Sequence, residues 1–228
     1  VGILYGAKLA FAQTDFKRLV AYTSVSHMGF VILGVFSFNE IAYQGVIIQM
    51  IAHGISTGAL FILVGQLYER IHTRDLNKMG GLWEKAPFMG AMGLIFSMAS
   101  LGLPGLGNFI AELLILVGAF KASVLMSCLA CSGLIAATIY SLRIVQKVFL
   151  GKKNGKWEIN DLNVREKTVL AALCIVIVGL GLFPKPVFNI SKPAVIKTLD
   201  IKEKTIHDEG ISKNETGEKS IHFYQISK

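Results

Sequence analysis

Two histidines and one carboxylate stand in long apolar stretches of this 228-residue sequence. They are His27, His53 and Glu112, each in a different stretch. An ionised group inside a lipid bilayer is energetically costly, so it must face a partner or water within the protein. Histidine titrates near neutral pH and can accept a proton on one ring nitrogen and release it from the other. The three residues therefore predict a proton relay, and a carboxylate satisfied structurally by a neighbouring helix is the alternative.

Further polar residues accompany both histidines. Along the segment of the second histidine they recur at i, i+4, i+7 and i+8, the spacing of one helical face. These residues are Gln49, His53, Ser56 and Thr57. Thr23 and Ser24 precede the first histidine by about one helical turn. The stripe is expected to face the protein interior and to support the relay, because the rest of its segment is apolar.

The segment that carries Glu112 also contains residues that interrupt a helix. These residues are Pro104, Gly102 and Gly105. Proline lacks a backbone N–H, and its ring opposes the carbonyl four residues earlier. The helix is expected to restart near 107–108, which places Asn108 one turn before Glu112. Unwound backbone at membrane depth survives only when it is buried in protein or lines a wet cavity. A broken helix with an ionisable group is how transporters build ion sites.

The composition is that of an integral membrane protein. Hydrophobic residues make up 53% of the chain and charged residues 17%, against roughly 25% charged residues in soluble domains. Several apolar runs reach the roughly 20 residues that a spanning helix needs. They lack the alternation of barrel strands, so the predicted fold class is an all-α membrane bundle. A soluble enzyme is excluded, and nucleic acid is not the expected partner of the +8 net charge, which lies in loops and tail.

Six apolar elements are expected, the fourth of them broken, followed by a polar tail. They cover about 1–13, 19–38, 42–68, 88–120, 124–149 and 168–189. This divides the chain into a transmembrane domain, 1–196, and a tail, 197–228. Lys and Arg concentrate in 15–18, 69–85 and 143–167, which predicts that these segments lie together on the cytoplasmic side and the tail on the periplasmic side. Gly-xxx-Gly spacing at 2–6 and 54–58 predicts close helix contacts.

Nothing in the sequence indicates a cofactor held by this chain. Cys128 and Cys131 have CxxC spacing within an apolar run. They are expected to be small buried side chains rather than a redox or metal site. No cysteine set could hold an iron–sulfur cluster, and no GxxxxGK[ST] loop is present to hold ATP. The first residue, Val1, stands inside an apolar stretch without a signal-peptide pattern. The simplest expectation is a sequence that begins partway through a larger membrane protein.

Three runs of the sequence resemble a known family. The runs are FAQTDFKRLVAYTSVSHMGFVILGVF (11–36), QMIAHGISTGALFILVGQLYERIHTRDLNKMGGLW (49–83) and SLGLPGLGNFIAELLILVGAF (100–120). They are similar to the M-chain family of bacterial respiratory complex I, the proton-translocating NADH:quinone oxidoreductase, which is related to mitochondrial NADH dehydrogenase subunit 4. The resemblance covers about 1–190. It implies an antiporter-like fold of fourteen transmembrane helices, of which this chain looks like the C-terminal part, the second inverted five-helix repeat plus the last helix.

The resemblance also implies roles for single residues. Glu112 falls on the family's glutamate at the proton exit, His53 on the central axis, and His27 on another position of that hydrated axis. Electron transfer would belong to partner subunits, which would hold NADH, flavin, iron–sulfur clusters and quinone, with no cofactor in this chain. The expected partners are other membrane subunits of the complex, in the bacterial inner membrane. The sequence departs from the family at Ala111, where glycine is frequent, and it lacks the lysines of the first repeat.

Two other functions remain open at this point. Subunits of multisubunit cation/proton antiporters share the same fold, without NADH chemistry. A structural membrane piece that transports nothing is the third possibility.

Overall fold

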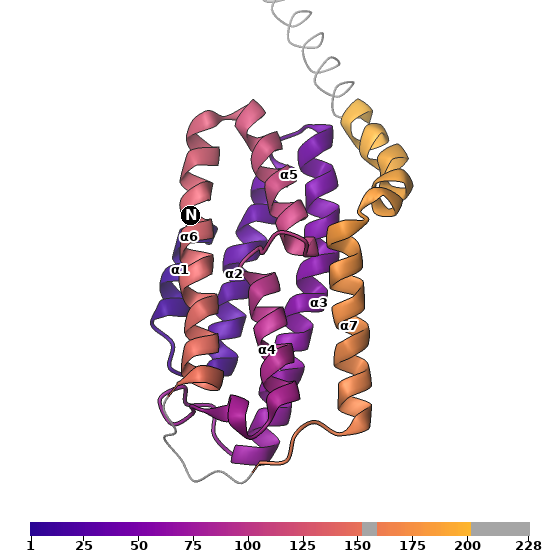
Figure 1. The fold of residues 1–228 in the computed structure, drawn as a ribbon. Helices are drawn as coiled ribbons and strands as arrows, with labels where there is room; N and C mark the ends of the chain where they lie inside the picture. Colours follow the sequence, from indigo (N-terminus) through magenta and orange to yellow (C-terminus); the bar gives the residue numbers. More distant parts are fainter. Residues whose placement is uncertain (152–158, 202–228) are drawn as a thin grey trace, which may run out of the picture.

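A computed structural model of the chain describes residues 1–151 and 159–201, and its regular structure is a bundle of helices (Figure 1). In chain order the helices are α1 (Gly2–Phe11), α2 (Phe16–Val35), α3 (Glu40–Ile71), α4 (Pro87–Ser100), α5 (Gly107–Ala122), α6 (Val124–Ile144) and α7 (Val164–Leu182). A 3₁₀ turn, η1 (Leu82–Glu84), precedes α4, and a π-helical segment, η2 (Val145–Leu150), prolongs α6. Within the described ranges the only β-pairing is an isolated bridge between Asp15 and Asp75. The all-α fold class is confirmed.

Several helices have the length and hydropathy of membrane spans. Among the described residues three qualify alone, α2, α3 and the continuous stretch Val124–Leu150, and a fourth qualifies if α7 and the helix after it form one bent span. α4 and α5 are each shorter, but they follow one another across the bundle, with α4 in the lower half and α5 in the upper half of Figure 1. The chain is therefore a multi-pass membrane protein, as its composition predicted.

Short polar side chains and one proline mark where the helices begin. The carboxylate of Asp15 accepts the N–H of Arg18 at the start of α2, and Asn39 does the same for Ala42 in α3. Such caps satisfy N–H groups that have no partner inside the helix. Pro87 occupies the first turn of α4, where its missing N–H costs nothing.

The predicted break in the fourth apolar element is confirmed. α4 ends at Ser100 and α5 begins at Gly107, so residues 101–106 are unwound. Gly102 and Gly105 have φ of +79° and +95°, a left-handed conformation that glycine adopts without steric cost. α7 covers this backbone from outside: a Cβ on Gly181 would collide with the carbonyl of Gly105. α7 thus covers the unwound segment at Gly105, and Leu106 is buried, whereas Leu103 and Pro104 are exposed.

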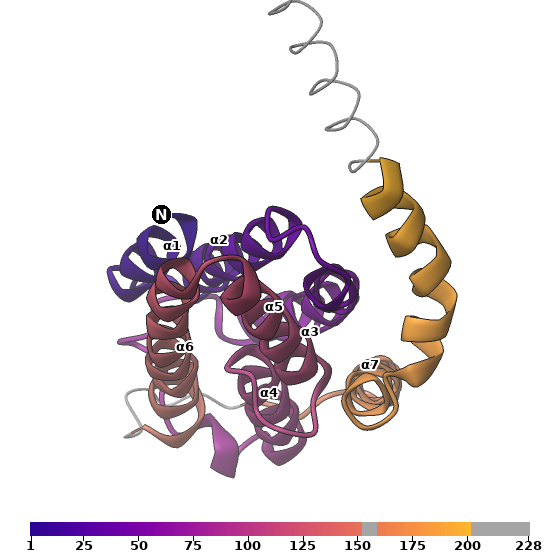
Figure 2. The ribbon, with the colours of Figure 1, turned by 90° about the horizontal axis from the view of Figure 1, so that it is seen from above.

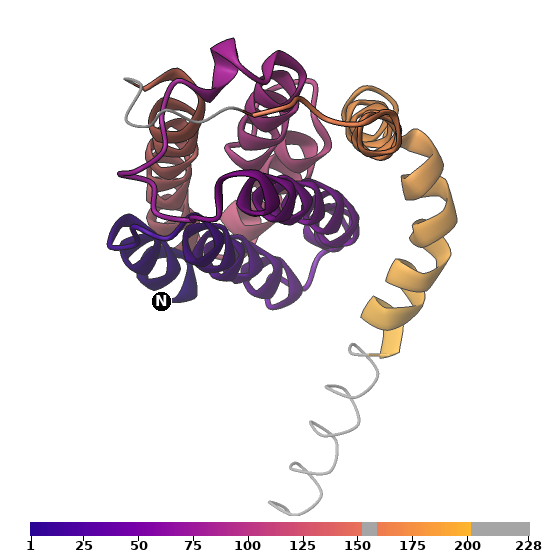
Figure 3. The same cartoon turned by 90° about the horizontal axis from the view of Figure 1, so that it is seen from below.

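The described parts of the three basic segments, 15–18, 69–85, 143–151 and 159–167, lie at one end of the bundle, the lower end of Figure 1 and the near face of Figure 3. The N–H of Phe16 donates to the carbonyl of Arg74 at 2.8 Å, and the N–H of Leu76 donates to Thr14 at the same distance. The guanidinium of Arg143 donates to the carbonyl of Phe11. We call this end the basic end and the opposite one the far end.

The C-terminal region differs from the expected single element, 168–189. α7 ends at Leu182, and a second helix, Lys185–Ile201, leaves it at an angle of 69°. Figure 2 shows this helix extending from α7 at the edge of the bundle. Pro184 explains the interruption, since it lacks the backbone N–H that would continue α7. The second helix runs through the expected domain boundary at 196, and the rest of the predicted tail, 202–228, lies outside the described residues.

Two packing predictions have mixed outcomes. A Cβ on Gly6 would meet backbone atoms of Ser26, so the predicted close contact at 2–6 is confirmed. A Cβ on Gly54 or Gly58 would have no atom within 4 Å, so the prediction for 54–58 is wrong within the described residues. Cys128 and Cys131 are free thiols on the outer surface, and the expectation that they are buried is also wrong.

Candidate functional site

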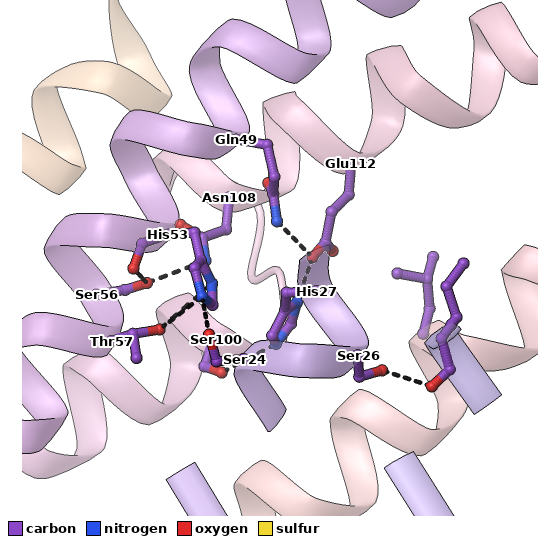
Figure 4. Close-up of polar contacts among 12 residues, drawn as sticks. Ser24, Ser26, His27, Gln49, His53, Ser56, Thr57, Ser100, Asn108 and Glu112 are labelled. Atoms are coloured by element: carbon purple, nitrogen blue, oxygen red, sulfur yellow. Dashed lines mark hydrogen bonds and ion pairs between the residues drawn. The ribbon is translucent and has the colours of Figure 1, made fainter. Parts of the chain in front are cut away.

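The three titratable residues meet in the interior of the bundle (Figure 4). His27 stands in α2, His53 in α3 and Glu112 in α5, and their exposed fractions are 1%, 6% and 3%. None of them lies next to another in the sequence. Their convergence therefore comes from the packing of the three helices.

His27 and Glu112 form a direct pair. Nδ1 of His27 lies 2.9 Å from Oε1 of Glu112. A carboxylate can only accept, so Nδ1 carries the shared proton whenever Glu112 is ionised. The side-chain N–H of Gln49 donates to the same carboxylate oxygen at 3.3 Å. Residues from α2, α3 and α5 thus converge on one carboxylate oxygen.

Two hydroxyl groups contact the other nitrogen of His27. The hydroxyl of Tyr140, from α6, lies 3.0 Å from Nε2, and the hydroxyl of Ser100, the last residue of α4, lies 3.3 Å from it. Both side chains are buried, with Tyr140 fully enclosed. When Nδ1 carries the only ring proton, Nε2 accepts from these hydroxyls. His27 therefore connects Glu112 on one side with Tyr140 and Ser100 on the other.

His53 has partners of its own. Its Nε2 lies 2.8 Å from the hydroxyl of Ser24, and the hydroxyl of Thr57 lies 3.3 Å from both ring nitrogens. The rings of His53 and His27 are tilted against each other with their centroids 5.3 Å apart. His53 is thus adjacent to the His27–Glu112 pair without being hydrogen-bonded to its carboxylate.

Asn108 extends the polar cluster at the start of α5. Its side-chain N–H donates to the hydroxyl of Ser56 at 3.1 Å. Buried oxygens of Gln49 and Asn108, and the hydroxyls of Ser97 and Ser141, have no hydrogen-bond partner among the described residues. Buried polar groups are rarely left unsatisfied, so these atoms mark positions for internal water.

The helix break fits closely around the carboxylate. A Cβ on Gly102 would lie 2.9 Å from Oε2 of Glu112. Glycine is therefore required at this position both for its backbone conformation and for space. Pro104 and Gly105 belong to the same unwound segment but do not crowd the carboxylate, since Pro104 is exposed and a Cβ on Gly105 would have no atom within 4 Å.

The structure adds residues that sequence reasoning missed. Tyr140 and Ser100 were not expected, because a tyrosine in an apolar helix resembles a packing residue and Ser100 stands at the edge of the break. Ser24 was expected beside His27, but it bonds His53 across the helix interface. Thr23 donates to the carbonyl of Val20 in its own helix. Among the described residues no group of three or more His, Cys, Asp or Glu could hold a metal ion.

Comparison with known proteins decides the family. A family model described as NADH:quinone oxidoreductase/Mrp antiporter, transmembrane, matches residues 1–139. The chain belongs to this family. Its antiporter-like fold agrees with two solved structures. A chain of respiratory complex I from Thermus thermophilus with bound NADH has a TM-score of 0.79 at 38% identity, over 87% of this chain and 43% of that one. A chain of the Mrp complex from Dietzia has a TM-score of 0.80 at 20% identity, over 87% of this chain and 46% of that one, which shows the shared fold alone.

Curated relatives carry a more specific name. A protein of Pseudomonas aeruginosa named NADH-quinone oxidoreductase subunit M is 53% identical over 191 residues. The match covers 84% of this chain and 38% of that relative. The subunit M of Escherichia coli is 47% identical over 198 residues, 86% of this chain and 39% of that relative. The chain thus spans less than half the length of these relatives. The resemblance to the M-chain family is confirmed.

Proposed function

We propose that this chain is part of a membrane subunit of a proton-pumping NADH:quinone oxidoreductase. It would move protons along Glu112, His27 and His53 while other subunits transfer electrons from NADH to quinone. The contact between His27 and Glu112 carries this proposal. A buried, hydrogen-bonded acid and base beside a broken helix can exchange a proton with little movement. The family's description as oxidoreductase and antiporter subunits favours a role for this exchange in proton transport.

Proton exchange within the pair follows from its geometry. His27 first receives a proton on Nε2 from the side of Tyr140 and Ser100 and becomes an imidazolium. Its Nδ1 proton then passes to Oε1 of Glu112, which becomes a neutral carboxylic acid and leaves His27 neutral. Gln49 donates to the same carboxylate oxygen and so helps to hold Glu112 beside His27. A change in the nearby charge would shift this balance, which is how events in other subunits could drive the transfer.

His53 would supply protons to the pair. Its ring lies beside that of His27, and the hydroxyl of Ser24 bonds its Nε2. The unpartnered oxygens of Gln49 and Asn108 favour water molecules within the same cluster. A hydrated cluster with hydroxyl side chains offers a chain of hydrogen bonds along which protons move.

The relatives' shared name, a subunit of an NADH-quinone oxidoreductase, supports other subunits of that oxidoreductase as partners. We further propose that partner subunits hold NADH, flavin, iron–sulfur clusters and quinone, with no cofactor in this chain. We place the protein in a bacterial inner membrane with the basic end cytoplasmic and the C-terminal tail periplasmic. Glu112 lies beyond the helix break on the side of the far end, so the proton would leave toward the periplasm.

Proton uptake by vesicles containing the assembled complex tests the proposal. We expect Glu112→Gln in the full-length subunit to lower NADH-driven proton uptake while NADH oxidation and assembly persist. Sodium-driven proton exchange without NADH would instead favour a cation/proton antiporter, the second function that the family's description allows. Unchanged pumping by a fully assembled Glu112→Gln complex would leave only a structural role.

A further inference from the structure

An apolar layer separates Glu112 from the far end of the bundle. The side chains of His27 and Gln49 both contact the carboxylate of Glu112. One helical turn nearer the far end on the same three helices stand apolar residues. They are Phe30 on α2, Val46 on α3 and Ile115 on α5, each three positions away from its polar counterpart. We call these three residues the apolar layer.

The layer is closely packed. Its exposed fractions are 1% for Phe30, 5% for Val46 and 0% for Ile115, and all three belong to one buried cluster. Val46 and Ile115 pack directly against Gly34 of α2, because a Cβ there would meet both side chains. The three helices therefore touch around the layer with no space for a water molecule at Gly34.

The packing remains tight beyond the layer. A Cβ on Gly118 of α5 would meet Ala42 of α3, and the side-chain N–H of Asn39 donates to the carbonyl of Gly118 at 2.9 Å. In the direction of the far end, a proton on Glu112 therefore first meets the three buried side chains of the apolar layer. The cluster below the layer is different, since it is polar and contains unpartnered oxygens that favour water.

We propose that Phe30, Val46 and Ile115 form a hydrophobic gate on the exit side of Glu112. This inference rests on the proposed function and adds the point at which the path is closed. A narrow apolar constriction blocks conduction by excluding water, and it conducts when it becomes wet. The closed gate prevents protons from returning to Glu112 from the far end. Release of the proton requires the layer to separate and admit water.

Two threonine substitutions test the gate. Val46→Thr and Ile115→Thr each place a hydroxyl in the layer while nearly conserving shape at Val46. We expect passive proton permeability of vesicles containing the complex, without NADH, to rise about tenfold, equivalent to ~1.4 kcal/mol off the barrier. Val117→Thr is the matched control, because Val117 stands on α5 two positions beyond Ile115 but is 42% exposed. This control should remain as proton-tight as the wild type.

A double variant tells the gate apart from the relay. If the leak passes through Glu112, adding Glu112→Gln to Val46→Thr should abolish it. Two independent layer variants guard against a local defect in one of them, and both complexes are first confirmed to assemble. If the vesicles of both layer variants remain as proton-tight as the wild type, the gate proposal is wrong. The relay proposal would still stand if Glu112→Gln lowers pumping. A leak that persists with Glu112→Gln would also overturn the gate proposal, because protons would then bypass the carboxylate.

Discussion

Nδ1 of His27 lies 2.9 Å from Oε1 of Glu112, although 85 residues separate the two in the sequence. Both side chains are almost completely buried, so each replaces water for the other. Neither group could be ionised at low cost in this position alone. The two side chains therefore form a coupled pair, and their contact depends on the packing of α2 against α5.

A double-mutant cycle should reveal this coupling. His27→Gln and Glu112→Gln should each lower the thermal stability of the full-length subunit in its complex. The double variant should lose less than the sum, with a coupling free energy of roughly 0.5–3 kcal/mol, the range for contacting residues. Thermal unfolding of the purified complexes measures it. Strictly additive losses would show that the two side chains do not stabilise each other.

The helix break should tolerate alanine differently at its two glycines with positive φ. Gly102→Ala and Gly105→Ala both impose a left-handed backbone on a residue with a Cβ, at a cost of about 1–2 kcal/mol. Only Gly102→Ala also pushes against Oε2 of Glu112, whereas Gly105 has open space. Both variants should lose similar stability, but only Gly102→Ala should lose most of its proton uptake. Equal transport by the two would mean that the break does not position the carboxylate.

Tyr140 should matter through its hydroxyl rather than its ring. Tyr140→Phe keeps the aromatic packing and removes the O–H beside Nε2 of His27. We expect NADH-driven proton uptake to fall about fivefold, the rate equivalent of the ~1 kcal/mol that one hydrogen bond contributes. Tyr5→Phe is the matched control, since Tyr5 is 58% exposed. Full activity of Tyr140→Phe would limit Tyr140 to packing.

At the basic end, Asp161 should make the start of α4 sensitive to acid. Its carboxylate accepts the N–H groups of Phe88 and Met89 at 2.9 and 3.1 Å. Partial burial alone would raise the pKa of this carboxyl, but the donated backbone N–H groups and the Lys167 ammonium hold the pKa below its ordinary value of 3.8. The stabilisation is therefore complete above the unfolded pKa and is lost as the pH falls through the lower folded value.

Hydrogen exchange of the amides of Phe88 and Met89 measures this effect. Their protection factors should stay constant from neutral pH down to about pH 4 and decline below it. In Asp161→Asn the free energy of opening at these amides should be lower at neutral pH by about 0.3–1 kcal/mol, the stabilisation that a charge provides at a helix N-terminus. The protection in this variant should also no longer depend on acid. Asp75→Asn, at the same end but away from α4, should behave like the wild type. An acid response that survives in Asp161→Asn would contradict this assignment.

The sequence predicted the local features of the site better than its contacts. The break was predicted from Pro104, Gly102 and Gly105, because their backbone preferences act locally. His27, His53 and Glu112 were predicted as site residues, because polar groups in apolar helices are energetically costly in lipid. The pairing of His27 with Glu112, and of Ser24 with His53, depends on how the helices rotate against one another, which no local pattern encodes. Tyr140 was missed because its hydroxyl matters only once α6 packs beside α2.

The protonation state of Glu112 during turnover tests the central claim most directly. Infrared difference spectra of the complex, recorded with NADH and quinone, separate a protonated carboxyl from a carboxylate. A relay through Glu112 predicts a carboxylic acid band that appears and disappears with turnover and is missing in Glu112→Gln. The band should persist in Glu40→Gln, whose glutamate pairs with Lys192 at the surface. Normal proton uptake with no change in any band assigned to Glu112 would contradict the account, because the carboxylate would then never carry the transported proton.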